Sequence, residues 1–396
     1  MEIGEWKVLY KCITKPTHAH KVPIIFLSGG FNSYETLIYE TTELAKEHPV
    51  YIVDLPGMGA NHQAAEGLNE EDYSLVLKNF LDNLGIDRIY LIGQSYSSSI
   101  AFSFASFFNE RVEKLILSGV TSRLRESVRY VLEESLDHLA NSNVEKFASS
   151  IVLNMMNFSQ RHNIQEASTI NQALYDNLLS FNELDKKRYH ANFSRLTNLQ
   201  GLPRAPQCPV LVISGEFDNF TTPYENFQVA RACPYSTYVL VKGTDHLAGH
   251  EKKDVMTRLY RRYLGNAPLN RMKDVEVIER DEFPREKMRM EPRWLLNDVG
   301  FLDAGNGVFV PVNIVDINNF GCRLYTSFKD HKSLKRTNKF LLHIPDEDMQ
   351  VEVILFQQAD NGHYRGIFKH ITFEKTKEFE GFIDKVAMSC TMAYAA

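Results

Sequence analysis

Short apolar runs alternate with amphipathic segments through residues 1–265, and this alternation limits the possible folds more than any other feature. The runs lie at 22–27, 50–53, 88–92, 112–117, 210–213 and 237–241 and contain few polar residues. Strands that are covered on both faces have this pattern, because neither face meets water. Helical periodicity lies between them at 34–47, 72–84 and 98–108. The order predicts an α/β fold with a doubly wound parallel sheet, and residues 6–13 are expected to add an antiparallel edge strand.

One connection in this pattern is much longer than the others, since about 85 residues separate the run that ends near Gly119 from the run at 210. It is amphipathic and helix-rich at 124–139, 144–156 and 164–179. Long structureless loops are rare in compact domains, so we expect a helical cap at about 122–200 over the carboxyl edge of the sheet. Such a cap would wall a pocket and exclude water. Its apolar residues would suit an acyl chain or only pack the cap on the sheet: Val152, Leu153, Met155, Met156 and Phe158.

The pattern changes after residue 265. Residues 266–283 are expected to form a linker, and β-like runs follow at 307–314, 322–325, 339–343, 350–357 and 364–373. Asp-Ala-Gly-Asn-Gly and Asp-Asn-Gly turns separate these runs, and a helix is expected at 374–386. The sequence therefore predicts a second, small β-barrel domain at 284–396.

Composition excludes several classes of protein. The apolar runs are far shorter than the ~20 residues that cross a bilayer, and the N-terminus lacks the basic and apolar regions of a signal peptide. The five cysteines are scattered without CxxC spacing, which favours a reducing cytoplasm over a disulfide framework or a zinc site. The net charge of −6 gives no global attraction for a nucleic acid polymer. No histidine–carboxylate cluster has metal-ligand spacing, so no metal or catalytic cofactor is expected.

The strongest motif is Gly93-Gln94-Ser95-Tyr96-Ser97, which follows a strand and opens a helix. Such a turn holds a serine hydroxyl at the carboxyl edge of the sheet and points the next backbone N–H, that of Tyr96, at a developing oxyanion. Ser97 stands where the usual GxSxG motif has its second glycine. A strand-to-helix turn with small neighbours is also common without any catalytic role.

A serine nucleophile needs a base and an orienting acid. Asp218 follows the next-to-last strand and His246 follows the last one. The order Ser95, Asp218, His246 is that of α/β-hydrolase triads, so these three are the predicted catalytic residues. His250 is an alternative base, and Asp245 and Glu216 are alternative acids.

The second oxyanion donor is expected in the glycine loop after the first parallel strand, from the N–H of Gly30 or Phe31, with Phe31 preferred. Ser28 stands where a histidine usually precedes the two glycines. A plain glycine-rich turn is the alternative interpretation.

Residues 1–265 resemble the α/β-hydrolase superfamily and, within it, the 3-(3-hydroxyalkanoyloxy)alkanoate synthase of rhamnolipid biosynthesis. The resemblance rests on the segments 215–222, 243–246 and 189–199 and on the glycine loop without histidine. It implies acyl transfer between 3-hydroxyacyl thioesters of coenzyme A or acyl carrier protein through acyl-Ser95. A plain esterase or thioesterase would share the same residues.

A cluster of arginines precedes the second domain, at Arg285, Arg289 and Arg293, and a polar turn follows with Asp316, Asn318 and Gly321. Guanidinium groups clamp phosphates and stack on bases, although a charged linker would have the same composition. Residues 284–385 resemble the PilZ domain, whose RxxxR and [D/N]xSxxG elements bind cyclic di-GMP. Asn318 replaces the serine, and the arginine pair is either Arg285/Arg289 or Arg289/Arg293.

The PilZ resemblance implies cyclic di-GMP as a regulatory ligand and a bacterial cytoplasmic source. The sequence thus predicts a serine acyltransferase or hydrolase regulated by this nucleotide. The alternative is a non-catalytic adaptor that responds to cyclic di-GMP and keeps only a hydrolase-like fold.

Overall fold

The protein is described from a computed structural model, which describes residues 1–30, 35–284, 287, 291–303, 305, 307–327, 334, 338–359, 362–370, 372–390 and 392–393. The contacts between residues divide the chain into two compact units. The first comprises Met1–Leu124 and Gln160–Met288, and the second comprises Arg125–Ser159 and Arg289–Ala396. Each unit therefore contains two separate stretches of the chain.

The first unit is built on an eight-stranded sheet with the order β10-β9-β8-β7-β6-β4-β5-β3. The inner strands are parallel, and β3 and β10 are antiparallel edges. The strands are β3 (Leu9–Ile13), β4 (Ile24–Leu27), β5 (Val50–Asp54), β6 (Ile89–Gln94), β7 (Val112–Ser118), β8 (Val210–Gly215), β9 (Ser236–Val241) and β10 (Val275–Ile278), and a short hairpin of β1 (Glu2–Ile3) and β2 (Trp6–Lys7) precedes them. The predicted doubly wound sheet and its N-terminal edge strand are confirmed.

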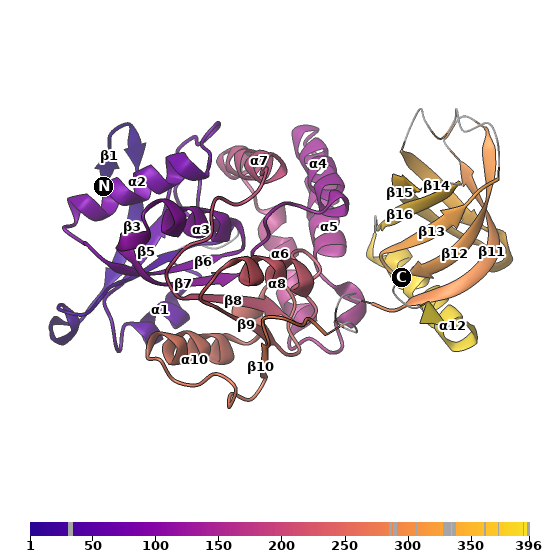
Figure 1. Ribbon diagram of the computed structural model, residues 1–396. Coiled ribbons are helices and arrows are strands. Elements are labelled where there is room, and N and C mark those ends of the chain that lie inside the picture. Colours follow the sequence, from indigo (N-terminus) through magenta and orange to yellow (C-terminus); the bar gives the residue numbers. More distant parts are fainter. Residues whose placement is uncertain are drawn as a thin grey trace. The chain divides into compact units, whose positions relative to one another are not determined.

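Helices cover both faces of this sheet (Figure 1). On one face, α1 (Ile38–Leu44) and α10 (Lys253–Leu264) pack over buried side chains such as Phe26 and Ile92. The other face carries α2 (Glu70–Asn83) and α3 (Ser98–Phe107). This burial on both faces explains why the strands are almost continuously apolar. The unit also contains α6 (Ala167–Leu179), α7 (Glu183–Thr197), α8 (Pro223–Ala232) and α9 (Ala248–Glu251).

The expected linker at 266–283 contains a strand. Val275–Ile278 pairs antiparallel with β9 over its whole length and forms an edge of the sheet. The backbone of Lys242 continues this pairing by donating to the carbonyl of Asp274 at 2.9 Å. A run of four residues between charged neighbours is too short to show a clear period, which is why the sequence did not predict it.

The second unit contains an antiparallel barrel. Its sheet has the order β12-β13-β16-β15-β14-β11-β17, and an additional pairing of β12 with β11 closes it. Its core is apolar, with Ile314, Leu342 and Phe379 buried at its centre. The elements are β11 (Arg293–Asp303), β12 (Phe309–Asn318), β13 (Gly321–Tyr325), β14 (Lys339–Ile344), β15 (Met349–Ala359), β16 (His363–Lys369), α12 (Phe373–Ser389) and β17 (Met392–Ala393). The predicted small β-barrel domain is confirmed as a fold.

The expected cap at 122–200 is divided between the two units. Helices α4 (Glu126–Ala140) and α5 (Val144–Met155) belong to the second unit, whereas α6 and α7 belong to the first. All four helices lie where helical periodicity was found or directly follow it. The contacts that join α4 and α5 to the barrel link residues more than two hundred positions apart, so periodicity alone could not reveal them.

Candidate active site

The chain makes a sharp turn where β6 ends and α3 begins. Ser95 sits at this turn with φ of 50°, a left-handed conformation that is uncommon for a residue with a side chain. Gly93 permits the close packing behind it, since a Cβ there would lie 2.7 Å from Ala101 Cβ and 2.9 Å from the carbonyl oxygen of Ser97. Strain of this kind is typical of functional positions, and here it raises the Ser95 hydroxyl from the end of the strand.

Ser97 fills the place of the usual second glycine without disturbing the turn. Its hydroxyl accepts from the backbone N–H of Gln94 at 2.9 Å and lies 3.0 Å from the carbonyl oxygen of Leu27, to which it can donate. The side chain is fully buried. The hydroxyl therefore links the turn to the neighbouring strand β4.

Ser95, His246 and Asp218 form one continuous chain of contacts. Ser95 Oγ lies 2.6 Å from His246 Nε2, and His246 Nδ1 lies 2.9 Å from Asp218 Oδ2. The three side chains stand in the loops that follow β6, β9 and β8, where parallel strands end at one edge of the sheet. The structure thus brings together the three residues that the sequence predicted as catalytic.

The carboxylate of Asp218 is fixed by its own loop. Its Oδ1 accepts from the backbone N–H groups of Phe220 at 2.9 Å and Thr221 at 2.8 Å, and its Oδ2 accepts from Thr221 Oγ1 at 2.9 Å. The residue is 1% exposed. These donors hold the charged form in a place where an unpaired carboxylate would be costly.

His246 is enclosed on several sides. The ring of Phe220 meets it edge-on with 4.8 Å between ring centroids. Gly119 leaves room for it, because a Cβ at Gly119 would lie only 2.8 Å from His246 Cε1. Burial disfavours the imidazolium, but the charge and hydrogen bond of Asp218 outweigh burial, so the pKa of His246 lies above its ordinary value.

The alternative base and acids have other partners. The carboxylate of Asp245 accepts from the backbone N–H of His246 at 2.7 Å, and that of Glu216 accepts from the N–H of Gly243 at 2.9 Å. His250 lies within α9, where burial lowers its pKa. The contact to Ser95 Oγ is made by His246, and the carboxylate oxygen against the His246 ring belongs to Asp218.

Of the expected oxyanion donors, Tyr96 and Gly30 lie close to one another. Tyr96 follows Ser95 at the turn, and a Cβ added to Gly30 would lie 3.6 Å from Tyr96 Cβ, so the glycine loop passes beside the turn. Phe31, the preferred second donor, lies outside the described residues. Ser28, which stands in place of the usual histidine, donates to the buried carboxylate of Asp54 at 2.6 Å.

Arg195 on α7 is a residue that sequence reasoning missed. Its guanidinium is buried, donates to the hydroxyl of Tyr96 at 2.9 Å and to its carbonyl oxygen at 3.0 Å, and pairs with Glu70. It also bonds Ser99 Oγ at 3.1 Å. Burial lowers the pKa of Arg195 to about 9. A helix of the expected cap is therefore bonded to the residue that follows the serine.

Glu251 is a second residue without a signal in the sequence. Its Oε2 accepts from the backbone N–H of Asp245 at 2.6 Å, directly before His246, and the residue is 4% exposed. Burial raises the pKa of Glu251 to about 9. A neutral carboxyl group thus supports the turn that carries the base.

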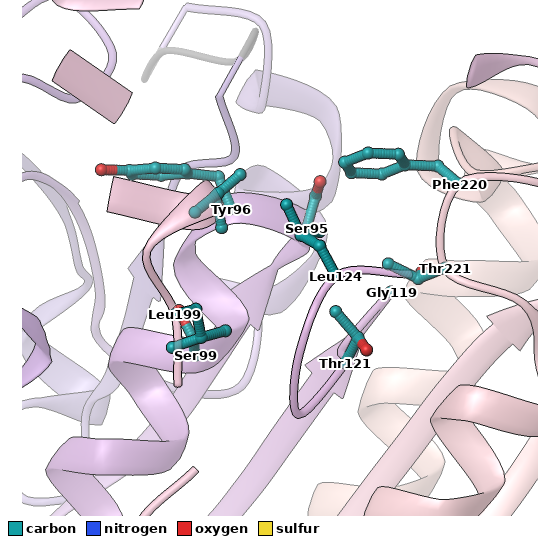
Figure 2. A pocket seen from close by; sticks show the side chains of 10 residues that line it. Ser95, Tyr96, Ser99, Gly119, Thr121, Leu124, Leu199, Phe220 and Thr221 are labelled. Atoms are coloured by element: carbon teal, nitrogen blue, oxygen red, sulfur yellow. The ribbon is translucent and has the colours of Figure 1, made fainter. Parts of the chain in front are cut away.

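A small cavity of about 20 Å³ opens beside Ser95. Figure 2 shows the Ser95 side chain between Tyr96 and Phe220, with Thr121 and Leu124 contributed by the segment after β7. Most of its larger side chains are apolar. The lining is formed by Ser95, Tyr96, Ser99, Gly119, Thr121, Leu124, Leu196, Leu199, Phe220 and Thr221.

In the second unit, the predicted nucleotide-binding residues are partly described. The carboxylate of Asp316 accepts from Arg293 Nη1 at 2.7 Å and is paired with Arg323 Nη2 at 2.9 Å. Asn318 Oδ1 accepts from the backbone N–H groups of Phe320 and Gly321 at 3.1 and 3.0 Å. The structure thus brings Arg293 and Asp316 together and closes the turn at Gly321, while Arg285 and Arg289 lie outside the described residues.

No described helix has the length and apolar character needed to cross a membrane. Among the described residues, no group of three or more histidine, cysteine, aspartate or glutamate side chains is arranged to hold a metal ion.

Known proteins that are similar to this chain have the fold of its first unit. The chain is 33% identical over 108 residues to a 2-hydroxy-6-oxononadienedioate/2-hydroxy-6-oxononatrienedioate hydrolase of Paraburkholderia phymatum, which spans 26% of this chain and 38% of that protein. The Cupriavidus pinatubonensis enzyme of the same name is 26% identical over 56% of this chain and 78% of its own length. The crystal structure of an α/β hydrolase from a Medee basin deep-sea metagenome library covers 68% of this chain and 98% of its own, with 18% identity and a TM-score of 0.59.

The family model of the alpha/beta hydrolase fold matches residues 22–253, which is more than half of the chain and includes Ser95, Asp218 and His246. The barrel lies beyond this match. The sheet, the strained turn at the serine and this family match all agree. The chain therefore belongs to the α/β-hydrolase fold family.

Proposed function

We propose that this α/β-hydrolase cleaves acyl compounds through a covalent acyl-Ser95 intermediate. The observation that carries the proposal is the contact chain from Ser95 Oγ through His246 to Asp218, with distances of 2.6 and 2.9 Å. A hydroxyl in contact with an imidazole, which is in turn oriented by a buried carboxylate, is the arrangement that activates serine for attack on a carbonyl.

In the first half of the reaction, His246 Nε2 takes the proton of Ser95 as Oγ forms a bond to the carbonyl carbon. The negative oxygen is held by the N–H of Tyr96 and a donor from the glycine loop. The intermediate collapses, the bond to the leaving thiolate or alkoxide breaks, and that group takes the proton from His246. Asp218 stabilises the imidazolium while it exists.

In the second half, the acceptor gives its proton to His246 and its oxygen attacks the acyl carbon. The bond to Ser95 Oγ breaks, and the serine recovers its proton from His246. Water as acceptor gives a free acid, whereas a hydroxyl group gives a new ester. The relatives named as hydrolases favour water, and the resemblance to a 3-hydroxyacyl ester synthase favours a hydroxyl acceptor.

For the substrate we propose acyl or 3-hydroxyacyl thioesters of coenzyme A or acyl carrier protein. This is supported by the apolar side chains beside Ser95, which include Leu124, Leu196 and Leu199. Simple esters fit the same chemistry. The test is mass spectrometry of the products that form from a panel of these thioesters, with Ser95→Ala as the control.

A condensed 3-hydroxyacyl ester made only by the wild type would identify an acyltransferase, and free 3-hydroxy acid alone would identify a thioesterase. Labelling of Ser95 by a fluorophosphonate tests the nucleophile itself. A folded protein that resists the label would favour the non-catalytic adaptor.

For the barrel we propose that cyclic di-GMP binds at a PilZ-like site. The proposal is supported by Arg293 beside the turn that contains Asp316 and Asn318, because arginine contacts both phosphates and bases. Arg293→Ala should weaken binding of the nucleotide in isothermal titration calorimetry. Equal affinity of the variant and the wild type would contradict this site.

A further inference from the structure

The second unit joins helix α5 to the barrel through a reciprocal pair of hydrogen bonds. Asn154 Nδ2 donates to the carbonyl oxygen of His370 at 3.1 Å, and the backbone N–H of His370 donates to Asn154 Oδ1, also at 3.1 Å. The remaining proton of the amide is directed to the carbonyl of Ser150, one turn back in α5. Asn154 is therefore held by the helix on one side and by the barrel on the other.

Ring contacts extend this junction. Phe158, just beyond α5, meets His370 edge-on with 4.7 Å between ring centroids and lies 5.5 Å from the ring of Phe320. His370 is 4% exposed, and burial lowers its pKa to about 4, so the ring is neutral at physiological pH. Its Nε2–H is placed to donate to the carbonyl oxygen of Asn319 at 2.7 Å.

Helix α4 is fixed to the same side of the barrel by charge. Glu134 is 8% exposed and pairs with Lys369, which precedes His370, and with Lys339 at 3.3 Å. A carboxylate buried to this degree requires a cation. The hairpin α4–α5 is thus anchored to the barrel at both of its helices.

Two of the barrel residues at this junction belong to the turn that the sequence singled out. Asn319 and Phe320 are the central residues of the turn that Asn318 closes onto Gly321. His370 therefore contacts both the turn, at Asn319, and the hairpin, at Asn154. A change in the backbone of the turn would move the carbonyl oxygen of Asn319, which accepts the hydrogen bond from His370 Nε2.

The other end of the hairpin leads into the serine site. Gly119, Thr121 and Leu124 line the cavity beside Ser95, and α4 begins at Glu126. The covalent distance from the cavity wall to the anchored hairpin is thus only two residues. A shift of the hairpin must be absorbed within this short segment.

We propose that the barrel controls the serine site through the α4–α5 hairpin, by means of an intramolecular interface formed by Asn154, Phe158 and Glu134 on the hairpin and by Asn319, Phe320, Lys369 and His370 on the barrel. The state of the turn at 318–321 sets the position of the hairpin, and the hairpin sets the cavity wall at 119–124. This proposal rests on the proposed function of Ser95 for its effect on rate. It does not depend on which ligand the barrel binds.

The test is Asn154→Asp, which removes the donor to His370 and places a carboxylate against its carbonyl oxygen. The matched control is Asn141→Asp, the same change in an exposed residue of the same hairpin, whose side-chain amide donates to the carbonyl of Asp137 one turn back in α4. Two quantities are measured on the full chain: the rate of fluorophosphonate labelling at Ser95, and amide hydrogen exchange at 119–124 and 144–155.

Asn154→Asp is expected to change the labelling rate by about fivefold or more, the range of typical coupling between sites, and to speed exchange at 119–124 as well as at 144–155. Asn141→Asp should leave labelling and exchange at 119–124 at the wild-type values. Phe158→Leu, which keeps an apolar side chain but removes the ring contacts, is a second variant with the same expected result.

Faster exchange at 144–155 with unchanged labelling and unchanged exchange at 119–124 would overturn the coupling. A wild-type protein that is not labelled at all would instead overturn the proposed function of Ser95. The exchange measurement would still decide whether the hairpin and the cavity wall are coupled.

Discussion

The guanidinium of Arg195 lies over the ring of Tyr96, with its central carbon 4.1 Å from the ring centroid, and donates to both the hydroxyl and the carbonyl oxygen of that residue. Tyr96 is 4% exposed and directly follows the serine. Since its N–H is the expected oxyanion donor, we predict that Arg195 positions that donor.

We predict that Arg195→Met lowers kcat by about tenfold to a hundredfold with a smaller change in KM, which is less than the ~10²–10³ lost with an oxyanion donor itself. Arg195→Lys should not restore the rate, because one ammonium cannot bond both oxygens of Tyr96 in the same fork. Steady-state kinetics on a chromogenic ester would measure this.

The single change leaves the half-buried carboxylate of Glu70, whose side chain is 17% exposed, without its cation. The double variant Arg195→Met/Glu70→Gln therefore separates stability from positioning. It should melt closer to the wild type than the single variant while keeping the low kcat. Recovery of kcat together with stability would show that Arg195 acts only on the fold.

Gly119→Ala is expected to lower the activity strongly although it replaces no residue of the triad. The new Cβ would lie 2.8 Å from His246 Cε1, and the φ of +67° at this position is strained for alanine. His246 must then move, and a shift of the order of 1 Å in a catalytic group costs about 10²-fold. The measurement is the rate of fluorophosphonate labelling at Ser95. A rate near that of the wild type would mean that His246 has more freedom than these distances allow.

The pH dependence of kcat/KM should report His246. The residue acts as a base only when it is neutral, and its pKa is raised because Asp218 outweighs the opposing effect of burial. When the pH is lowered, activity should therefore begin to fall at a higher pH than it would with an ordinary histidine of pKa ~6.5. Asp218→Asn should move this limb to lower pH and reduce kcat by about 10⁴-fold, as in other triads. An unmoved limb in a folded variant would assign the titration to another group.

Because of Glu251, the free energy of unfolding should decrease as the pH rises. The unfolded side chain loses its proton near the ordinary value of 4.5, whereas burial keeps it in the folded protein up to about 9. The stability that belongs to the protonated form is fully present below the unfolded pKa and is lost as the pH rises through the folded one.

Glu251→Gln keeps an acceptor for the N–H of Asp245 and cannot ionise. Between about pH 6 and pH 9 its free energy of unfolding should fall less than that of the wild type, as measured by urea denaturation. Parallel curves for the two proteins would show that Glu251 does not hold its proton.

The fold and the triad were accessible from the sequence because both follow local rules. Ser95, Asp218 and His246 each come directly after an apolar run, and parallel strands bring such positions to one edge. Arg195 was not accessible, since its partners Tyr96 and Glu70 lie 99 and 125 residues away. Its charge gave no sign that it would be buried.

Strand β11 shows a different limit. The pairing of β11 with β12 shifts register between Leu295 and Asp298, and Asn297 has a φ of 55°. This bulge interrupts the alternation of apolar and polar residues, and the sequence analysis predicted no strand at residues 293–303. The barrel was predicted without one of its strands.

The division of the chain at Leu124/Arg125 and Ser159/Gln160 has a consequence for biosynthesis. The hairpin α4–α5 leaves the ribosome long before Lys369 and His370, so Glu134 and Asn154 spend most of translation without their barrel partners. A chain that is cut after residue 265 would never supply them. The hydrolase sequence alone should then be prone to aggregation or to chaperone capture, although it contains every residue of the triad.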